Sequence, residues 1–144
     1  MAYTVNKVEM WSGEINDQVG GLAAKLEALA KAGADFEIVV ARRQPNVPGK
    51  GVVFLGPVTD ANVIKAAEAA GLKKAPDLVA LRVEGPNKPG EGSRVARKLA
   101  DAGINLRGLS ATAMGNKCVF SLAFDSDGDA TKASRALRAN DTKR

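Results

Sequence analysis

The sequence predicts an α+β protein in which one β-α-β-β-α unit occurs twice. The first observation is an internal repeat, because residues 20–36 align without a gap with residues 90–106 at a shift of 70 positions. The second is the order of elements: in each copy a strand-like run precedes the aligned helix, and two strand-like runs and another helix follow it. A length of 144 residues suits two small units that depend on one another.

The aligned segments predict one helix per copy. Their identical pairs are Gly20/Gly90, Leu29/Leu99, Ala30/Ala100, Ala32/Ala102 and Gly33/Gly103. Leucine and valine recur at helical spacing with charged residues opposite, so we expect one face of each helix to pack on a sheet.

Strand-like runs and turn residues define the rest of each copy. The expected strands are 5–11, 36–43 and 51–58 in the first copy, and 78–84, 104–111 and 117–125 in the second. Connections 44–50 and 112–116 carry the Pro, Gly and Asn that reverse a chain, which predicts hairpins. Second helices are expected at 59–71, capped by Thr59 or Asp60 and closed by Gly71, and at 129–139.

This order of elements is the ferredoxin-like plan, with antiparallel sheets and both helices on one face. The plan normally ends in a fourth strand, for which the segment after Asn140 is too short. Segments 2–15 and 75–85 are longer than a small sheet requires. We therefore expect two units, 1–76 and 77–144, with strands exchanged: the first half of each long segment completes one copy's sheet and the second half opens the other's.

Composition argues against most catalytic classes. The chain has no histidine and only one cysteine, Cys118, which excludes an internal disulfide and a thiolate metal cage and lowers the prior for triad hydrolases and zinc enzymes. We expect no catalytic residue, no metal and no cofactor. A net charge of +5 favours acidic partners without the density typical of nucleic-acid binders, and no long apolar run occurs, so we expect a cytoplasmic protein with no membrane partner.

The junction VEGPNKPGEGSR (83–94) is unusually rich in glycine and proline. The first N–H groups of a helix have no internal partner and carry partial positive charge, and glycine lets a ligand approach the backbone. The segment 87–93 would then form a shallow anion-binding nest, with Ser93 capping the helix or touching the ligand. Alternatively, these glycines only make a tight strand-to-helix turn. Dinucleotide and P-loop glycine signatures do not fit.

Two segments of the second copy, NKPG (87–90) and AGINLRGLSA (102–111), resemble the pattern of ACT domains, and DQVG (17–20) with AGADFEIV (32–39) resembles it more faintly. The whole chain is similar to stand-alone tandem ACT proteins, which have no catalytic domain. This resemblance implies a non-enzymatic allosteric sensor that binds an amino acid, pairs as a homodimer and acts on a regulated enzyme.

The resemblance also implies the ligand contacts. By position they are Asn16, Asp17, Gln18, Val19, Gly20, Gly21 and Asp35 in the first copy, and Asn87, Lys88, Pro89, Gly90, Glu91, Gly92, Ser93 and Asn105 in the second. Backbone N–H groups would hold the effector's carboxylate, and side-chain oxygens would receive its ammonium group. Asn87 replaces the usual aspartate and Val19 the usual proline, so either site has degenerated or has changed its ligand.

Two other functions use the same sheet. One is binding of single-stranded RNA, for which Phe120 and Phe124 share one face of a strand, although such a pair is more often core. The other is a small enzyme such as an acylphosphatase, with Arg94 or Arg107 and Asn105 aimed at a phosphate. The basic hairpin 42–51 is either a contact for a protein partner or an exposed charged turn.

Overall fold

A computed structural model describes residues 3–139 of the chain. The elements, in order, are β1 (Thr4–Asn16), α1 (Gly21–Lys31), β2 (Ile38–Arg43), β3 (Lys50–Gly56), α2 (Ala61–Ala69), β4 (Lys73–Pro86), α3 (Glu91–Asp101), β5 (Gly108–Met114), β6 (Lys117–Phe124) and α4 (Asp127–Arg138). The pairings β1–β3, β2–β3, β4–β6 and β5–β6 are all antiparallel, and the architecture is the expected α+β, ferredoxin-like one. Residues 140–144 lie outside the described part.

The chain divides into two compact units. Unit A contains residues 9–76, and unit B contains the described residues up to Val8 together with those from Asp77 onward. The strands β1 and β4 each contribute residues to both units. Residues 3–8 lie within the segment 2–15 for which a strand exchange was expected, and they cluster with the residues from Asp77 onward.

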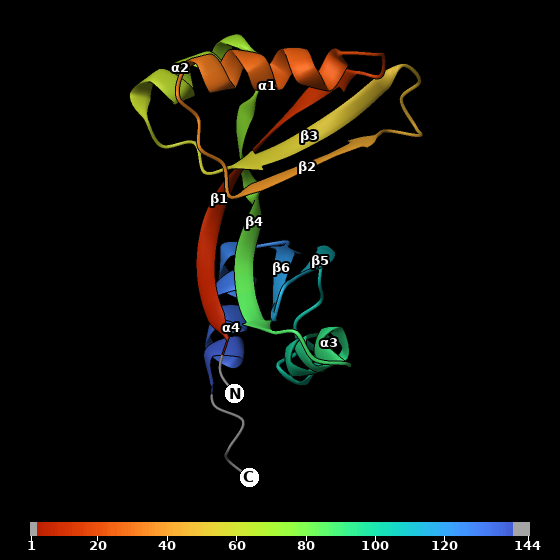
Figure 1. The fold of residues 1–144 in the computed structure, drawn as a ribbon, viewed down its shortest axis with the longest axis vertical. Coiled ribbons are helices and arrows are strands. Elements are labelled where there is room, and N and C mark those ends of the chain that lie inside the picture. Colours follow the sequence, from red (N-terminus) through yellow and green to blue (C-terminus); the bar gives the residue numbers. More distant parts are fainter. Residues whose placement is uncertain (1–2, 140–144) are drawn as a thin grey trace. The chain divides into compact units, whose positions relative to one another are not determined.

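In unit A, β2 lies beside β3, and β3 beside β1. The helices α1 and α2 cover one face of these strands (Figure 1). The register places Trp11 and Val39 on either side of Leu55, so these three side chains share the face toward the helices. The buried core of unit A consists of Trp11, Leu29, Val53, Leu55, Val58, Val63, Ala67 and Leu72.

In unit B, β4 pairs with β6, and β6 pairs with β5. Alternate residues of β6 are buried, as expected for a strand with one covered face. These are Cys118, Phe120, Leu122 and Phe124. They pack against Val95 and Leu99 of α3 and against Leu137 of α4.

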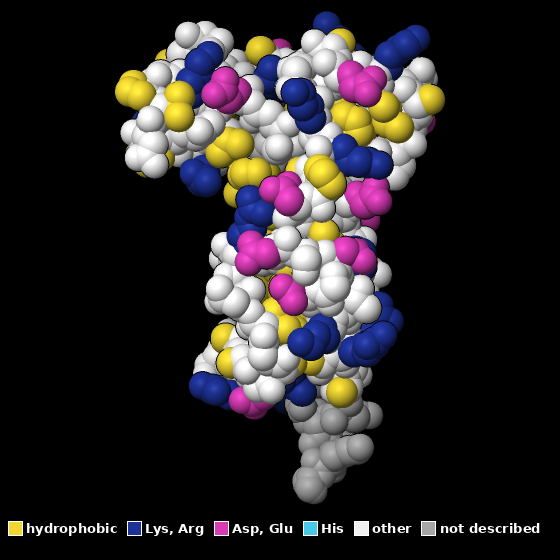
Figure 2. Space-filling model, turned by 180° about the vertical axis from the view of Figure 1, so that it is seen from behind, with side chains coloured by type: hydrophobic (Ala, Val, Ile, Leu, Met, Phe, Trp, Pro, Cys, Tyr) yellow, Lys and Arg dark blue, Asp and Glu magenta, His cyan; other side chains and the backbone are white. Residues whose placement is uncertain are grey.

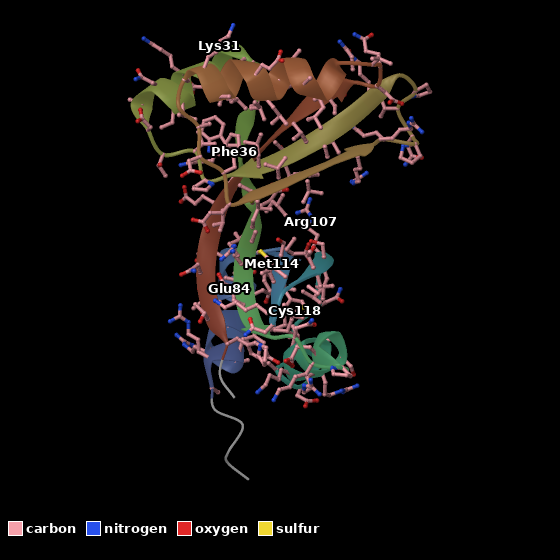
Figure 3. All side chains as sticks on the ribbon, viewed as in Figure 1. Lys31, Phe36, Glu84, Arg107, Met114 and Cys118 are labelled. Carbon is pink, nitrogen blue, oxygen red and sulfur yellow. The ribbon has the colours of Figure 1, made fainter. Side chains whose placement is uncertain are left out.

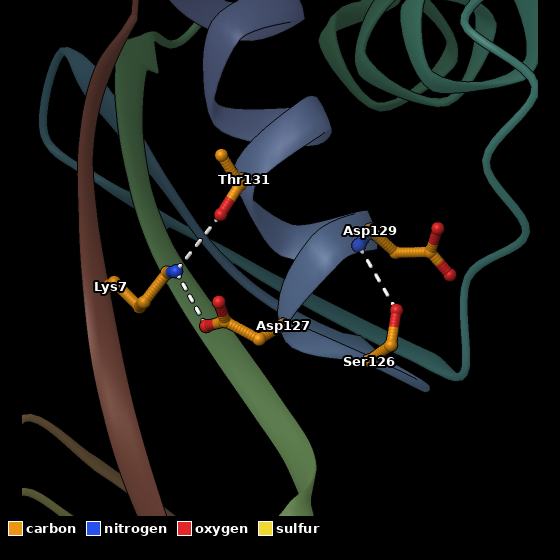
Figure 4. Close-up of polar contacts among 5 residues, drawn as sticks. All are labelled: Lys7, Ser126, Asp127, Asp129 and Thr131. Carbon is orange, nitrogen blue, oxygen red and sulfur yellow. Dashed lines mark hydrogen bonds and ion pairs between the residues drawn. The ribbon is translucent and has the colours of Figure 1, made fainter.

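The helix α4 begins two residues earlier than expected because Ser126 caps it: the Ser126 hydroxyl accepts from the backbone N–H of Asp129 at 3.1 Å. Lys7, on β1, donates to Asp127 at 2.7 Å and to Thr131 at 3.1 Å (Figure 4). The first residues of β1 are thus bound to the last helix, which explains their place in unit B.

The strand expected at 104–111 is wrong in its limits, because β5 spans Gly108–Met114. Ile104 is buried in the core of unit B, and Leu106 packs against that core. Their spacing by two positions imitates a strand, yet they belong to the connection after α3. Pairing begins only where the backbone N–H of Arg107 donates to Ala123 at 2.9 Å.

Candidate functional site

The start of α1 carries no side chain that would neutralise it. Gly20 is the N-cap residue, with a left-handed φ of 84° that glycine adopts without strain, and no side chain caps the helix. The first turn holds no acidic residue. The positive end of the helix dipole is therefore uncompensated by the helix itself.

The loop before α1 is tightly folded. The backbone N–H of Gln18 donates to Asn16 at 2.9 Å, that of Gly21 donates to Gln18 at 3.0 Å, and that of Asp17 donates to Gly49 at 3.0 Å. A Cβ at Gly21 would lie 2.1 Å from the carbonyl oxygen of Asn16. Glycine at position 21 is thus required by close packing of the backbone.

A cavity of about 600 Å³ opens beside this loop, within unit A. Its lining residues are Glu14, Ile15, Asn16, Gln18, Val19, Gly20, Gly21, Ala24, Lys25, Ala28, Lys50, Ala70 and Gly71. The wall formed by α1 consists largely of glycine and alanine, which leave room for a small molecule. The size is within the range of small-molecule sites.

Two lysines supply positive charge to this cavity. Lys25 donates to the carbonyl of Ala70, the C-cap of α2, and so connects the two helices of unit A. The ammonium of Lys50 donates to Asn16 Oδ1 at 3.0 Å. Together with the start of α1, they make the cavity suited to an anion.

Asp17 already has a cationic partner. Arg43 Nε donates to Asp17 Oδ2 at 2.5 Å, and this bond raises the pKa of Arg43. Asp17 and Gln18 line a second, smaller hollow of about 190 Å³ with Arg42 and Arg43. Val19 is fully exposed. Residues 16–21 thus form one loop, in which Asp17 faces the β2–β3 hairpin.

In unit B the equivalent helix start is filled by the protein's own side chains. Gly90 is the N-cap, again with φ of 84°, but Glu91 follows it and is only 5% exposed. The Glu91 carboxylate accepts from Tyr3 Oη at 2.9 Å and from Arg94 Nε at 2.8 Å. Arg94 also donates to the carbonyl of Pro89 at 3.1 Å. A carboxylate therefore already lies at this helix start.

The surroundings of Glu91 favour its charged form. Burial is the largest single influence and raises the pKa of Glu91. The hydrogen bonds from Arg94 and Tyr3, with the charges of Arg94 and Lys88, outweigh it and hold this pKa below the ordinary 4.5. Glu91 is thus an ionised, buried carboxylate at neutral pH.

The other residues expected in the second site have structural roles or lie elsewhere. Asn87 binds the β5–β6 hairpin, its backbone N–H donating to Asn116 at 3.0 Å. Lys88 accepts from the Glu91 backbone, and Gly92 and Ser93 lie inside α3, so the expectation that Ser93 caps this helix is wrong. The cap is Gly90.

Asp35 and Asn105 are exposed and follow the C-terminal ends of α1 and α3. Each helix has 11 residues and is therefore about 16 Å long. Within its own unit, each residue is thus separated from the loop at the other end of its helix. The structure brings together 16–21 but not Asp35.

The sequence predicted the glycines but missed the side chains that distinguish the two sites. At a shift of 70, Gly21 corresponds to Glu91 and Ala24 to Arg94. The large, paired side chains of unit B replace small ones that line the cavity of unit A. The alignment contained this signal, but only the structure shows its consequence.

Among the described residues, those singled out for the two alternative functions are buried, apart from one another or bound to other groups. Phe120 and Phe124 are fully buried, so they offer no stacking surface to RNA. Figure 2 shows basic side chains interspersed with acidic ones on the visible face. Arg94 and Asn105 lie at opposite ends of α3, and Arg107 donates to the carbonyl of Asp77 at 2.9 Å. These groups do not form one phosphate site.

Among residues 3–139, no helix is long and apolar enough to cross a membrane. The same residues contain no group of three or more histidine, cysteine, aspartate or glutamate side chains that could hold a metal ion.

No family model and no curated protein matches the chain, but solved structures do. The regulatory subunit of aspartate kinase from Thermus thermophilus is 17% identical, with 95% of both chains covered and a TM-score of 0.64. Protein BT0572 from Bacteroides thetaiotaomicron is 16% identical, with 95% of this chain and 99% of that chain covered and a TM-score of 0.69. Aspartokinase III of E. coli, solved with lysine and aspartate, is 11% identical over 94% of this chain and 32% of that chain, with a TM-score of 0.56. The chain therefore shares its fold with the regulatory subunit of aspartate kinase.

Proposed function

We propose that the chain is a non-catalytic, tandem ACT-type regulatory protein that binds an amino acid in the cavity beside the start of α1. The observation that carries the proposal is the uncapped helix start, without an acidic residue in its first turn, facing a cavity lined by Lys25 and Lys50. The fold shared with regulatory subunits supports it. The cytoplasmic location stays a prediction.

In this proposal the effector's carboxylate accepts from the first N–H groups of α1, and its ammonium group binds the side-chain oxygen of Asn16, which lines the cavity. Lys25 connects the site to α2, because its ammonium donates to the carbonyl of Ala70. A bound carboxylate competes for that ammonium. Binding therefore changes a contact between two helices, which is how the signal would pass on.

The second site is proposed to be occupied internally. Glu91 stands where an effector's carboxylate would bind, and Arg94 covers the turn beside it. A second anion would meet like charge in a buried position. We therefore place effector binding in unit A alone, and assign unit B's loop residues 87–93 to folding.

The proposed partners are a second copy of the chain and a regulated enzyme. β2 and β5 each pair with one other strand and expose apolar side chains. These include Val39 and Val40 on β2 and Leu109 and Met114 on β5, the last labelled in Figure 3. Exposed strand edges of this kind favour pairing between chains.

A thermal-shift screen against the twenty amino acids tests the proposal, beginning with lysine and aspartate, the ligands of the E. coli enzyme's structure. A ligand at about 100 times its dissociation constant stabilises the native state by about 2.7 kcal/mol. We expect at least one amino acid to raise the melting temperature of the wild type by several degrees.

The decisive variant is Ala24→Arg, which puts a large side chain into the cavity of unit A at the position that corresponds to Arg94 in unit B. Ala23→Arg is the matched control, because Ala23 is also exposed on α1 but does not line the cavity. We expect the shift to persist in the control and to vanish in Ala24→Arg. An unchanged melting-temperature shift in Ala24→Arg would show that the effector binds elsewhere. A shift with an RNA oligomer but with no amino acid would refute the proposal.

A further inference from the structure

The charges that line the cavity beside the start of α1 are unbalanced. Lys25 and Lys50 contribute two ammonium groups, and Glu14 contributes the only carboxylate among the described lining residues. The start of α1 adds about half a positive charge, because its first N–H groups point the same way. The cavity therefore offers more positive than negative charge to a ligand.

The protein itself does not neutralise either lysine. Lys25 donates to the carbonyl of Ala70, and Lys50 donates to the side-chain oxygen of Asn16 at 3.0 Å, so both ammonium groups bind uncharged oxygens. The ion pairs formed within residues 3–139 include neither of these lysines. An ammonium forms a stronger hydrogen bond to a carboxylate than to an uncharged oxygen. Both groups are thus better satisfied by a ligand that brings a carboxylate.

The rest of the lining offers little to a large apolar side chain. Of the two larger apolar residues there, Val19 is fully exposed and Ile15 is partly buried against the core. Most of the remaining lining residues are small: glycine at 20, 21 and 71, and alanine at 24, 28 and 70. Burial of apolar surface would add little to binding here, so charge has to decide between amino acids of similar size.

We propose that the effector is an acidic amino acid, aspartate or glutamate, an inference that rests on the proposed effector site. Its α-carboxylate binds the start of α1, and its ammonium binds Asn16, with Glu14 as the balancing carboxylate. The side-chain carboxylate pairs with Lys25 or Lys50. Lys25 lies four positions after Gly21, about 6 Å along the helix axis, so one small dicarboxylate reaches both the helix start and this flexible side chain. Lysine is disfavoured, because its second ammonium would meet like charges.

A second carboxylate also gives the signal a physical cause. The ammonium of Lys25 donates to the uncharged carbonyl of Ala70 at the end of α2. A charge-assisted hydrogen bond is about twice as strong as a neutral one, so a side-chain carboxylate competes well for this ammonium. A neutral amino acid has only the carboxylate that the start of α1 holds. An acidic effector therefore changes the contact between α1 and α2 more than a neutral one does.

Calorimetric titration of the wild type with matched ligands tests the inference. The probes are L-aspartate with L-asparagine, and L-glutamate with L-glutamine, because each pair keeps the shape and differs in one charge; L-lysine is the fifth ligand. We expect at least one acid to bind about tenfold or more tightly than its amide, and lysine to give no saturable heat. Amides that bind as tightly as the acids, or lysine as the tightest ligand, would overturn the inference.

Variants identify the group that recognises the second carboxylate. Lys25→Met and Lys50→Met each remove one ammonium and keep a long side chain. We expect at least one of them to lower the affinity for the acid about tenfold while the affinity for its amide changes little, so that the ratio between the two approaches one. Lys31→Met, at the other end of α1 and outside the cavity, is the matched control and should keep the wild-type ratio (Figure 3). A wild-type ratio in both cavity variants would overturn the inference.

The same titrations separate failure of this inference from failure of the proposed function. If a neutral or basic amino acid binds in preference to both acids, and Ala24→Arg loses that binding, the effector site stands and the acidic ligand is wrong. If no amino acid binds the wild type, the proposed function is refuted and this inference with it.

Discussion

Replacing Glu91 should destabilise the protein at neutral pH, because this carboxylate is the buried acceptor for two donors. A hydrogen bond to a charged group contributes about 1.5–3 kcal/mol, and a buried donor left unpaired adds a penalty. The bond from Arg94 counts for less, since that side chain is 47% exposed and screened by water. We therefore count mainly the bond from Tyr3 and expect Glu91→Ala to cost about 2 kcal/mol, which lowers the melting temperature by roughly 5 °C or more.

Glu91→Gln isolates the charge, and its effect should depend on pH. The folded-state pKa of Glu91 lies below 4.5, its ordinary value, so the native state prefers the ionised form. The stability from this preference is fully present above the ordinary pKa and is lost as the pH falls through the folded-state pKa. The difference in unfolding free energy between the wild type and Glu91→Gln should thus shrink as the pH falls from about 5 toward 3.

Urea unfolding followed by circular dichroism, repeated from pH 7 to pH 3, measures this difference. Asp101→Asn is the control, because the Arg97–Asp101 pair lies on the same helix with both side chains largely exposed. We expect the control to follow the wild-type curve. If Glu91→Gln equals the wild type at pH 7, or if its deficit in unfolding free energy is the same at every pH, the charge of Glu91 does not stabilise the helix start as argued.

Three further substitutions test the fold through unfolding free energies. Asp60→Ala should cost about 1 kcal/mol, because Asp60 accepts from the backbone N–H of Asn62 at 2.8 Å and caps α2; an unchanged value would exclude this cap. Phe120→Ala, in the core of unit B, should cost about 3–5 kcal/mol, and a cost below 1 kcal/mol would contradict its full burial. Gly85→Ala should cost about 1–3 kcal/mol, because the new Cβ would lie 2.5 Å from Tyr3 Cδ1, and it should also reduce the dependence of the unfolding free energy on pH that Glu91 causes. Wild-type stability with wild-type pH dependence would show that the Tyr3 ring moves away freely.

The sequence predicted the repeated elements well where local chemistry determines them. α1 and α3 have the same length and begin at positions 70 apart, each directly after a glycine of positive φ. Apolar periodicity and glycines at helix ends are local signals, so they can be read without knowledge of the tertiary fold. The same reasoning misplaced the start of β5, because burial of Ile104 and Leu106 against the core imitates strand alternation.

The site was less predictable because its decisive contacts are remote in sequence. Tyr3 binds Glu91 across 88 positions, and no local pattern announces that bond. The sequence also does not predict the state of Trp11. An aromatic residue in a strand indicates burial, but it does not indicate that the indole N–H lacks a partner among the described residues. Sequence reasoning located the helix starts and could not say what occupies them.

The two copies show why the glycine motif alone does not identify a helix start that is open to a ligand. Gly20 and Gly90 have the same φ, yet one precedes an open cavity and the other a filled turn. Position 21 cannot accept a side chain, because its Cβ would meet the carbonyl of Asn16, whereas the equivalent position in unit B holds Glu91. The difference between the sites therefore depends on the loop geometry before the helix and on whether its first turn carries a carboxylate with its own arginine. A carboxylate that the protein supplies is always present at its helix start, so an effector would have to displace it in order to bind there.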